Sequence, residues 1–292
     1  MTRKVIYHYV DGPHGEEVTI TFGGMRKNIK ASDTGLFEDI LRAAENDDAD
    51  KLVELLDKAV RIKRSSGGLF EVRGTVVFID NEPAPEAISN KIIRFMEKEL
   101  SYRPLIEFWR KLKNNPSFNS RTQLFRFLEA NKVPIVDDVI GAVDFSGFFV
   151  AWKSVTSTFL DHHTKTIDNS PGRFVQMDRR EVDDNPSNTC SHGLHVAGWD
   201  YAWGFGENSK FVKVYIDPAD VVSVPNDYNG QKMRVCKYYV VEEVKREDVK
   251  EALSRDVVGS NSDDYDDDDY EEDEDICDED DDDNEDDIFN SY

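Results

Sequence analysis

A nearly pure run of acidic residues closes this chain and limits what its last part can fold into. From Asp263 to Asp287, 20 of 25 residues are Asp or Glu, and no Lys or Arg follows Arg255. Mutual repulsion and the scarcity of apolar side chains prevent such a run from burying a core. We therefore expect a disordered acidic tail over residues 256–292, and a folded body formed by the residues before it.

The strong negative charge of the chain belongs to this run alone. The sequence has 60 acidic and 36 basic residues, a formal net charge of -24. Without the 20 acids of the run, 40 acidic and 36 basic residues would remain, a net charge of about -4. This separation of charge predicts a tail that meets a basic surface, such as one built to hold nucleic acid.

The spacing of the acids matches that of a nucleic-acid strand. An extended residue advances roughly 3.3–3.6 Å, so the run would carry about one charge per 4 Å, against one phosphate per roughly 3.4 Å of a DNA strand. A DNA mimic is one interpretation; solubilising the chain, masking its own basic face and loose binding of divalent ions are alternatives. The candidate partner-binding acids are Asp263, Asp264, Asp266, Asp267, Asp268, Asp269, Glu271, Glu272, Asp273, Glu274, Asp275, Asp278, Glu279, Asp280, Asp281, Asp282, Asp283, Glu285, Asp286 and Asp287.

Length and composition bound the class of protein. A body of about 260 residues is long enough for two or three compact units. The three cysteines, Cys190, Cys236 and Cys277, form no disulfide framework and favour a reducing cytosol. The N-terminus has no signal-peptide core, and no apolar run approaches the roughly 20 residues of a membrane span. We expect a soluble intracellular protein without a membrane segment.

The first 80 residues predict a small α+β domain. Residues 4–10 and 17–23 are apolar or alternating segments joined by turn residues, which is typical of a β-hairpin. Ser32, Asp33 and Thr34 then predict the N-terminal cap of a helix.

A second helix and a second strand pair complete this domain. Apolar residues over 52–60 lie on one helical face, and a basic loop over 61–68 leads to strands at 69–74 and 75–80. The Pro-containing segment 81–85 predicts a linker.

The middle section, residues 86–133, predicts three helices and is locally basic. Nine bases stand against five acids between residues 86 and 130, and Ser120 is the expected cap of the third helix. A helix-turn-helix-like DNA reader and a plain packing unit with a solvated basic face both fit this pattern. With the preceding basic loop, the candidate DNA-binding residues are Arg61, Lys63, Arg64, Arg110, Lys111, Lys113, Arg121, Gln123 and Arg126.

Residues 134–255 predict a β-rich α+β domain. Buried strands are expected at 147–155, 211–216, 221–225 and 234–244, separated by Asn-, Asp- and Pro-containing turns. Residues 198–205 predict a short aromatic helix or packed turn. The whole chain is therefore expected to be α+β.

The segment from Cys190 to His195 holds the best candidates for enzymatic or metal chemistry. Cys190, His192 and His195 lie close in sequence, with His162 and His163 upstream. Zinc usually takes four ligands in paired groups, and no second pair follows here. A structural role is favoured, with a metal site or a Cys–His nucleophile pair as alternatives. No cofactor-binding motif occurs, and we expect no enzymatic activity.

Several long motifs carry a family resemblance. In order along the chain they read NNPSFNSRTQLFRFLEANKVPI, AWKSV, DNSPGRFVQMDRREVDDNPSNTCSHGLHVAGWDYA and VKVYIDPADVVSVPNDYNGQKMRVCKYYVVEE. Over about residues 110–245 they resemble the RIIB proteins of tailed phages. The acidic tail is a departure from the RIIB pattern.

Motifs and tail together are similar to early host-takeover proteins of large lytic Bacillus phages, a group that includes an acidic inhibitor of host RNA polymerase. The resemblance implies a phage early protein that shuts off host transcription. Host RNA polymerase, with DNA as a second partner, would be bound in the host cytoplasm, at the nucleoid if DNA is bound. An RIIB-type interaction module with a solubilising or self-masking tail, and a Cys/His enzyme or metal protein, are the alternatives.

Overall fold

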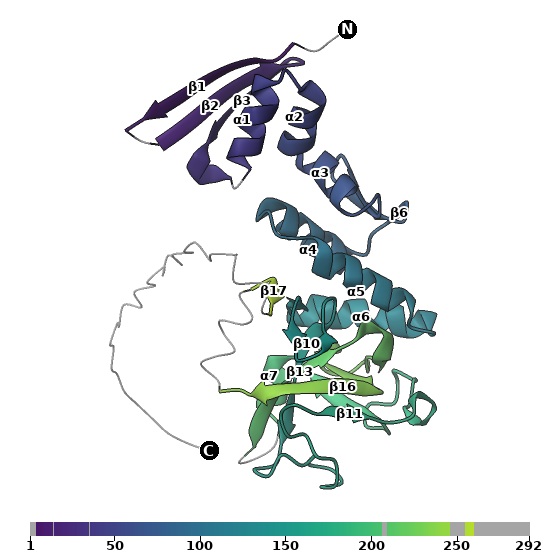
Figure 1. Cartoon of the computed structure of the whole chain (residues 1–292). Helices are drawn as coiled ribbons and strands as arrows, with labels where there is room; N and C mark the ends of the chain where they lie inside the picture. Colours follow the sequence, from purple (N-terminus) through teal and green to yellow (C-terminus); the bar gives the residue numbers. More distant parts are fainter. Residues whose placement is uncertain (1–3, 14, 35, 206–208, 246–254, 260–292) are drawn as a thin grey trace, which may run out of the picture.

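The protein is an α+β protein, as predicted. The computed structural model describes residues 4–13, 15–34, 36–205, 209–245 and 255–259. A small N-terminal unit, a helical section and a large sheet follow one another in space as they do in sequence (Figure 1).

The acidic run lies outside the described residues, so its predicted disorder stays a prediction.

The N-terminal unit packs two helices on a three-stranded antiparallel sheet. The predicted hairpin is confirmed, with Ile6 opposite Thr21, and a third strand follows it. Val18 and Ile20 are fully buried against the helices, because the alternation of the central strand turns one face inward. The elements are β1 (Ile6–Gly12), β2 (Gly15–Phe22), β3 (Met25–Lys30), η1 (Ala31–Asp33), α1 (Phe37–Glu45) and α2 (Ala49–Leu56).

Two local predictions in this unit were wrong. Helix α1 begins with Leu36 at its N-cap and without a side-chain cap, while Thr34 Oγ1 accepts a hydrogen bond from the Leu36 amide at 3.1 Å. The second predicted helix is two helices, α2 and α3 (Lys58–Ser65). It breaks at Asp57, whose carboxylate accepts from the Ala59 amide and starts α3. Most of the predicted basic loop therefore lies in a helix.

The second strand pair is confirmed and belongs to the larger core. The strands are β4 (Phe70–Arg73), β5 (Val76–Ile79) and the short β6 (Glu82–Pro83). Phe70 and Ile79 are buried with the helices that follow, whereas residues up to Leu56 form a separate apolar cluster. The buried core thus divides between Leu56 and Ile62, upstream of the boundary predicted at residue 80.

The three helices of the middle section are present as predicted. They are α4 (Glu86–Glu97), α5 (Arg103–Lys113) and α6 (Phe118–Asn131). The predicted cap of α6 was wrong by one turn, because Ser117 Oγ accepts from the Ser120 amide at 3.2 Å. Ser120 is buried inside the helix, where its hydroxyl donates to Val222 O at 2.6 Å. Its side chain therefore fastens α6 to the sheet.

The last part is a mixed sheet of nine strands. Its strands are β7 (Ile135–Val136), β10 (Phe149–Val155), β11 (Phe174–Gln176), β12 (Leu194–Ala197), β13 (Lys210–Ile216), β14 (Val221–Ser223), β15 (Lys232–Val235), β16 (Lys237–Glu243) and β17 (Val257–Val258). Their order is β11-β16-β13-β10-β12-β15-β14, with β7 beside β10 and β17 parallel to β7. Strands β8 (Val139–Ile140) and β9 (Val143–Asp144) form a separate hairpin. The buried strand at 147–155 is confirmed as β10.

One predicted strand is two. The segment 234–244 breaks at Cys236, whose amide donates to Asp220 O at 3.0 Å and whose carbonyl accepts from Met177 N at 2.9 Å. These loop contacts separate β15 from β16. The predicted aromatic helix is present as α7 (Trp199–Trp203).

The helical section and the large sheet share one core. Phe108 of α5 and Phe127 of α6 meet the Phe149 ring of β10, with ring centroids 6.3 and 6.1 Å apart. The buried Asn115 amide between these helices donates to Pro218 O and Val221 O. The helices therefore cover the sheet as part of the same folded body (Figure 1).

Candidate functional site

The last described strand precedes the acidic run in the sequence. Strand β17 is held beside β7, where Ile135 N donates to Asp256 O at 3.0 Å and Asp137 N donates to Val258 O at 2.9 Å. The run begins four residues after Gly259 in the sequence. All 20 candidate partner-binding acids lie outside the described residues.

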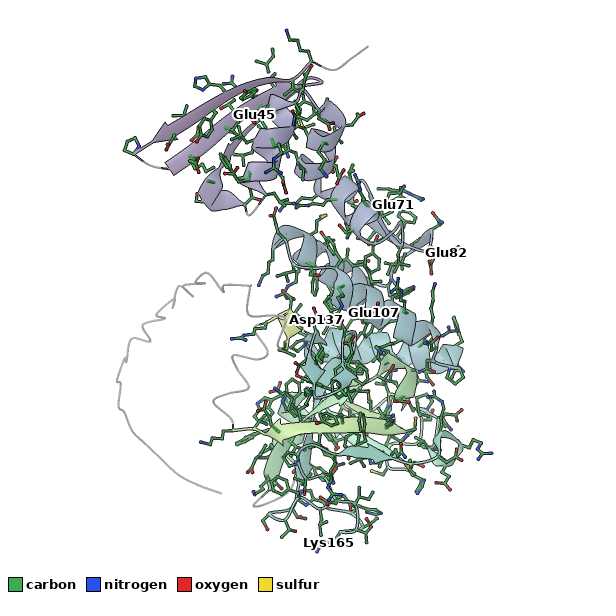
Figure 2. All side chains as sticks on the ribbon, viewed as in Figure 1. Glu45, Glu71, Glu82, Glu107, Asp137 and Lys165 are labelled. Atoms are coloured by element: carbon green, nitrogen blue, oxygen red, sulfur yellow. The ribbon has the colours of Figure 1, made fainter. Side chains whose placement is uncertain are left out.

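The three basic candidates of α3 each face a carboxylate. Lys63 Nζ lies 2.8 Å from Glu71 Oε1, and hydrogen bonds from Arg73 and Lys63 lower the pKa of Glu71, labelled in Figure 2, to about 2. The ion pairs of this helix join Arg61 to Glu99, Lys63 to Glu71 and Arg64 to Glu54.

The three basic candidates of α5 are also paired. Arg110 meets Glu107 on its own helix at 2.6 Å, while Lys111 reaches Asp217 at 3.7 Å. Lys113 pairs with Asp80, which lies just beyond β5. Two of these three pairs thus join α5 to other parts of the larger unit.

Helix α6 uses its polar candidates to hold the chain after β14. Gln123 Oε1 accepts from Val224 N at 2.8 Å, and Arg126 donates to Val224 O at 2.6 Å. Arg121 lies over the ring of Phe118, with 5.8 Å from its guanidinium carbon to the ring centroid. Gln123 and Arg126 therefore have structural partners on the sheet side.

The nine candidates for DNA contact come from three helices, and seven of them are cations with an internal carboxylate or carbonyl partner. Each of these seven cations therefore already has a partner inside the fold. DNA contact by these residues stays a prediction.

The Cys190–His195 segment is organised by a buried arginine. Arg234 of β15 is fully buried and donates to the carbonyl oxygens of Asp183, Asn185 and Asn188 at 2.5–2.8 Å. Gly193, with φ +148°, lies against it, since an added Cβ would fall 3.3 Å from Arg234 Cδ. The path of this loop thus has a structural explanation in its packing around one guanidinium.

The Cys and His candidates of this segment do not converge. Cys190 is an exposed free thiol, and His192 Nδ1 donates to Glu181 O at 2.7 Å. The pKa of His195 is lowered to about 4. Packing of neighbouring groups around the ring is the main cause, and the charge of Lys153 is the second. Within the described residues, no group of three or more His, Cys, Asp or Glu side chains could hold a metal ion.

The upstream Asp161–His163 segment also forms a structural turn. Burial raises the pKa of Asp161. Hydrogen bonds from the Ile167 and Thr164 amides outweigh burial and hold this pKa well below its usual range. His162 Nε2 lies 3.1 Å from Ser154 Oγ on β10, while His163 is exposed. His163 lies near enough to His195 for its charge to lower the pKa of that ring, but among the described residues these histidines form no group that could hold a metal ion.

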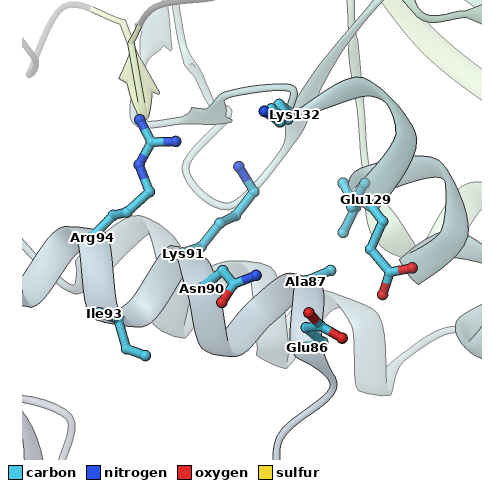
Figure 3. Close-up of a pocket in the computed structure, with 9 residues that line it drawn as sticks. Glu86, Ala87, Asn90, Lys91, Ile93, Arg94, Glu129 and Lys132 are labelled. Atoms are coloured by element: carbon cyan, nitrogen blue, oxygen red, sulfur yellow. The ribbon is translucent and has the colours of Figure 1, made fainter.

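A cationic cavity between α4 and α6 was not anticipated. It has a volume of about 580 Å³ and is lined by Lys91, Arg94 and Lys132, with Glu86 and Glu129 at its other end (Figure 3). Lys91 is only 8% exposed, and its ammonium donates to Val133 O at 2.7 Å. Burial lowers the pKa of Lys91 to about 8.

The same face of α4 already binds a carboxylate. Asp256, just before β17, lies 3.1 Å from Arg94 Nε and 3.6 Å from Lys98 Nζ. The sequence held a signal for this face, because Lys91, Arg94 and Lys98 recur at helical spacing and so share one side of α4. Their partner follows them by more than 150 residues, which no local pattern reveals.

Comparison with known proteins identifies the family. The family model described as bacteriophage T4 protein rIIB matches residues 15–275. The chain belongs to the rIIB family of phage proteins. It is also 36% identical over 228 residues to protein rIIB of Enterobacteria phage T4, which covers 78% of this chain and 70% of that protein. No solved structure matches the chain.

This family assignment confirms the resemblance drawn from the motifs. Among the described residues, no helix is both long and apolar enough to span a membrane.

Proposed function

We propose that this rIIB-family protein is a non-catalytic interaction protein that inhibits host RNA polymerase, with its acidic run acting as a mimic of DNA. The observation that carries the proposal is the separation of charge, since 20 of the 25 residues from Asp263 to Asp287 are acidic and the rest of the chain is nearly balanced. An unbalanced polyanion is attracted to basic channels that hold nucleic acid.

The contacts of the folded body support a binding role for the acidic run. Its basic candidates are used largely inside the fold, where they bind carboxylates or the chain after β14. The carboxylates of the run outnumber any cations near them in the sequence, because no Lys or Arg follows Arg255. The run is therefore the part of the chain with the largest unbalanced charge to offer a partner.

RNA polymerase is the partner that the likeness to acidic phage host-takeover proteins implies. Inhibition would take place in the host cytoplasm, and at the nucleoid if the body also binds DNA. Binding through the run would be mainly electrostatic, so it would weaken steeply as salt shortens the screening length.

The test compares three chains in pull-down and transcription assays with host RNA polymerase. They are the full chain, a deletion of residues 263–292, and a full-length variant whose 20 acids are changed to Asn or Gln. We expect both altered chains to lose most binding and inhibition, because they lack the charge. The neutralised variant keeps the length of the tail and so separates charge from bulk. Full inhibition by either altered chain would contradict the proposal.

Self-masking is the second candidate, favoured by the cationic face of α4. Asp256 already pairs with Arg94 and Lys98 there, and the cavity beside it holds Lys91 and Lys132. A run that starts a few residues later has a high effective concentration at this face.

Zero-length carbodiimide cross-linking distinguishes the two candidates. Self-masking predicts an intramolecular link from Lys91 or Lys132 to an acid of the run, abolished by changing both lysines to Gln. It also predicts that the deletion strengthens binding of the body to polyanions. A mimic that acts only on the polymerase predicts neither result.

A further inference from the structure

The outer strand of the N-terminal sheet has an open edge. Among the strands that the structure describes, β1 pairs with β2 alone, and the sheet order is β1-β2-β3. Figure 1 shows β1 on the outside of the N-terminal unit, away from the large sheet. The backbone groups on the free side of an edge strand can pair with another strand.

This edge carries an unusual amount of exposed apolar surface. Ile6, Tyr7, Tyr9 and Val10 are 64%, 42%, 38% and 44% exposed. Ile6 and Val10 lie opposite polar residues of β2 on the solvent face, whereas Tyr7 and Tyr9 lie opposite the buried residues of β2. Both faces of the strand thus offer apolar side chains at the same open edge.

The opposite edge of the sheet is protected in the usual way. Strand β3 carries Arg26, Lys27 and Lys30, and charged side chains, lysine above all, discourage pairing at an edge. From Ile6 to Val10, β1 has no Lys, Arg, Asp or Glu. Charged side chains therefore discourage further pairing at the β3 edge, whereas the β1 edge lacks this protection.

The sequence of the open edge is symmetric about its centre. Residues 6–10 read Ile-Tyr-His-Tyr-Val. In an antiparallel pair with a second copy centred on His8, Ile6 would oppose Val10, Tyr7 would oppose Tyr9, and His8 would oppose its own counterpart. Aliphatic would meet aliphatic and aromatic would meet aromatic, and such cross-strand pairs stabilise sheets. An isologous contact of this kind is what a two-fold dimer requires.

We propose that the protein forms a two-fold dimer through antiparallel pairing of β1 with β1 of a second copy, giving a continuous six-stranded sheet. Two short edge strands bury less than the roughly 1,200 Å² of a standard interface, so the dimer is weak, with a dissociation constant in the micromolar range. Because each copy has a net charge of -24, added salt strengthens the dimer by screening repulsion between the copies.

The first test is sedimentation velocity of the full chain at about 1–200 µM and at low and high salt. We expect a dimer that grows with concentration and with salt. His8→Glu places two carboxylates directly opposite each other, and like charges in that position are unfavourable, so it should weaken the dimer at least about tenfold. Thr19→Glu is the matched control, because Thr19 is the partner of His8 on the inner strand and lies on the same face.

A monomer at every concentration, or a dimer that survives His8→Glu, would overturn the proposal. So would a dimer that weakens with salt, since that would indicate contact of the acidic run with a basic face.

The second test fixes the register with cysteines, in a background with Cys190→Ser and Cys277→Ser. His8→Cys should form an intermolecular disulfide under mild oxidation, because directly opposed residues have Cα atoms roughly 4.5–5.5 Å apart. Ile6→Cys should not link to itself, since its two copies would lie about 13 Å apart along the strands, beyond the reach of a disulfide. Equal linking by Ile6→Cys would exclude the symmetric register.

The dimer does not depend on the proposed inhibition of polymerase. Its tests change β1 and leave the acidic run intact, so failure of one proposal is distinguishable from failure of the other.

Discussion

The N-terminal unit and the larger unit are built on different kinds of core. The core of residues 5–56 is wholly apolar, and every buried polar or charged residue of the described part follows residue 65. The larger unit encloses Arg234, Asp161 and Asn169, each with several hydrogen bonds. The small unit is therefore stabilised mainly by burial of apolar area, while the larger one also depends on polar groups that need their partners.

This difference gives the two units different roles. A polar network inside a core specifies one arrangement, because a lost partner leaves a buried group unsatisfied. The small apolar core contains no buried polar group that needs a partner. Its sheet has β1 as an edge strand. The larger unit thus depends on its buried polar contacts, whereas the N-terminal unit carries the β1 edge that we propose as a dimer contact.

The largest expected effect is the loss of a buried guanidinium from the larger unit. Arg234→Met would leave the carbonyl oxygens of Asp183, Asn185 and Asn188 without their donor, at a cost of about 3 kcal/mol or more in unfolding free energy. Urea unfolding followed by tryptophan fluorescence measures it, since all four tryptophans lie after residue 100.

The control for this variant is Arg180→Ala, whose side chain is 89% exposed and pairs with Asp178 two residues before it. It should change stability by less than about 0.5 kcal/mol. Equal loss in both variants would show that burial of Arg234 has no special importance.

The next effect tests whether the two cores unfold separately. Leu52 of α2 is fully buried in the N-terminal core, so Leu52→Ala should destabilise that unit by about 2–4 kcal/mol. Far-UV circular dichroism should report an earlier transition, while the tryptophan transition stays in place. Val60→Ala, at a 38% exposed position, is the control. A matching shift of the tryptophan signal would mean that the two cores unfold as one.

A smaller effect is expected where one buried hydroxyl is removed. Tyr238 donates to Asn169 Oδ1, and both side chains are almost completely buried. Tyr238→Phe leaves that oxygen without its donor and should cost about 1–3 kcal/mol. Tyr228→Phe, at a position 59% exposed, should be neutral. If the two variants unfold alike, the buried pair does not stabilise the larger unit.

The smallest effect is a dependence of stability on pH that belongs to the larger unit. Crowding by its neighbours and the charge of Lys153 lower the pKa of His195 to about 4, against about 6.5 in the unfolded chain. Because the side chain is exposed, solvent screening keeps the resulting effect on stability small. Between these values the unfolded chain binds more protons, so stability is full above about pH 6.5 and falls as pH drops toward 4.

His195→Gln should reduce this slope in the tryptophan-detected unfolding midpoint. Nuclear magnetic resonance should find the His195 ring titrating near pH 4. A titration near the ordinary value would remove the basis of the prediction.

Much of the fold followed from local patterns. Alternation predicted the first hairpin and the buried strand β10, and helical periodicity predicted α4, α5 and α6. The errors lay at residues whose side chains can either cap a helix or make another contact. Asp57 caps a new helix where apolar spacing continued, and Ser120 bonds to Val222 of the sheet, leaving Ser117 as the cap.

The candidate site followed from sequence only in part. The pair of Arg110 with Glu107 was predictable, because residues three apart meet on a helix. The contacts of Lys111 with Asp217 and of Arg126 with Val224 were not, since about 100 residues separate the partners. The basic excess of the helical section was visible in sequence, but its use inside the fold was not.

The sequence by itself determined the α+β class, the family motifs and the confinement of the acids to one run, because each of these depends on residues close together in the chain. Only the tertiary structure decided where the buried core divides, which carboxylates face the cations, and that β1 has an open edge. Those features depend on which distant segments pack together, and packing is set by the whole chain.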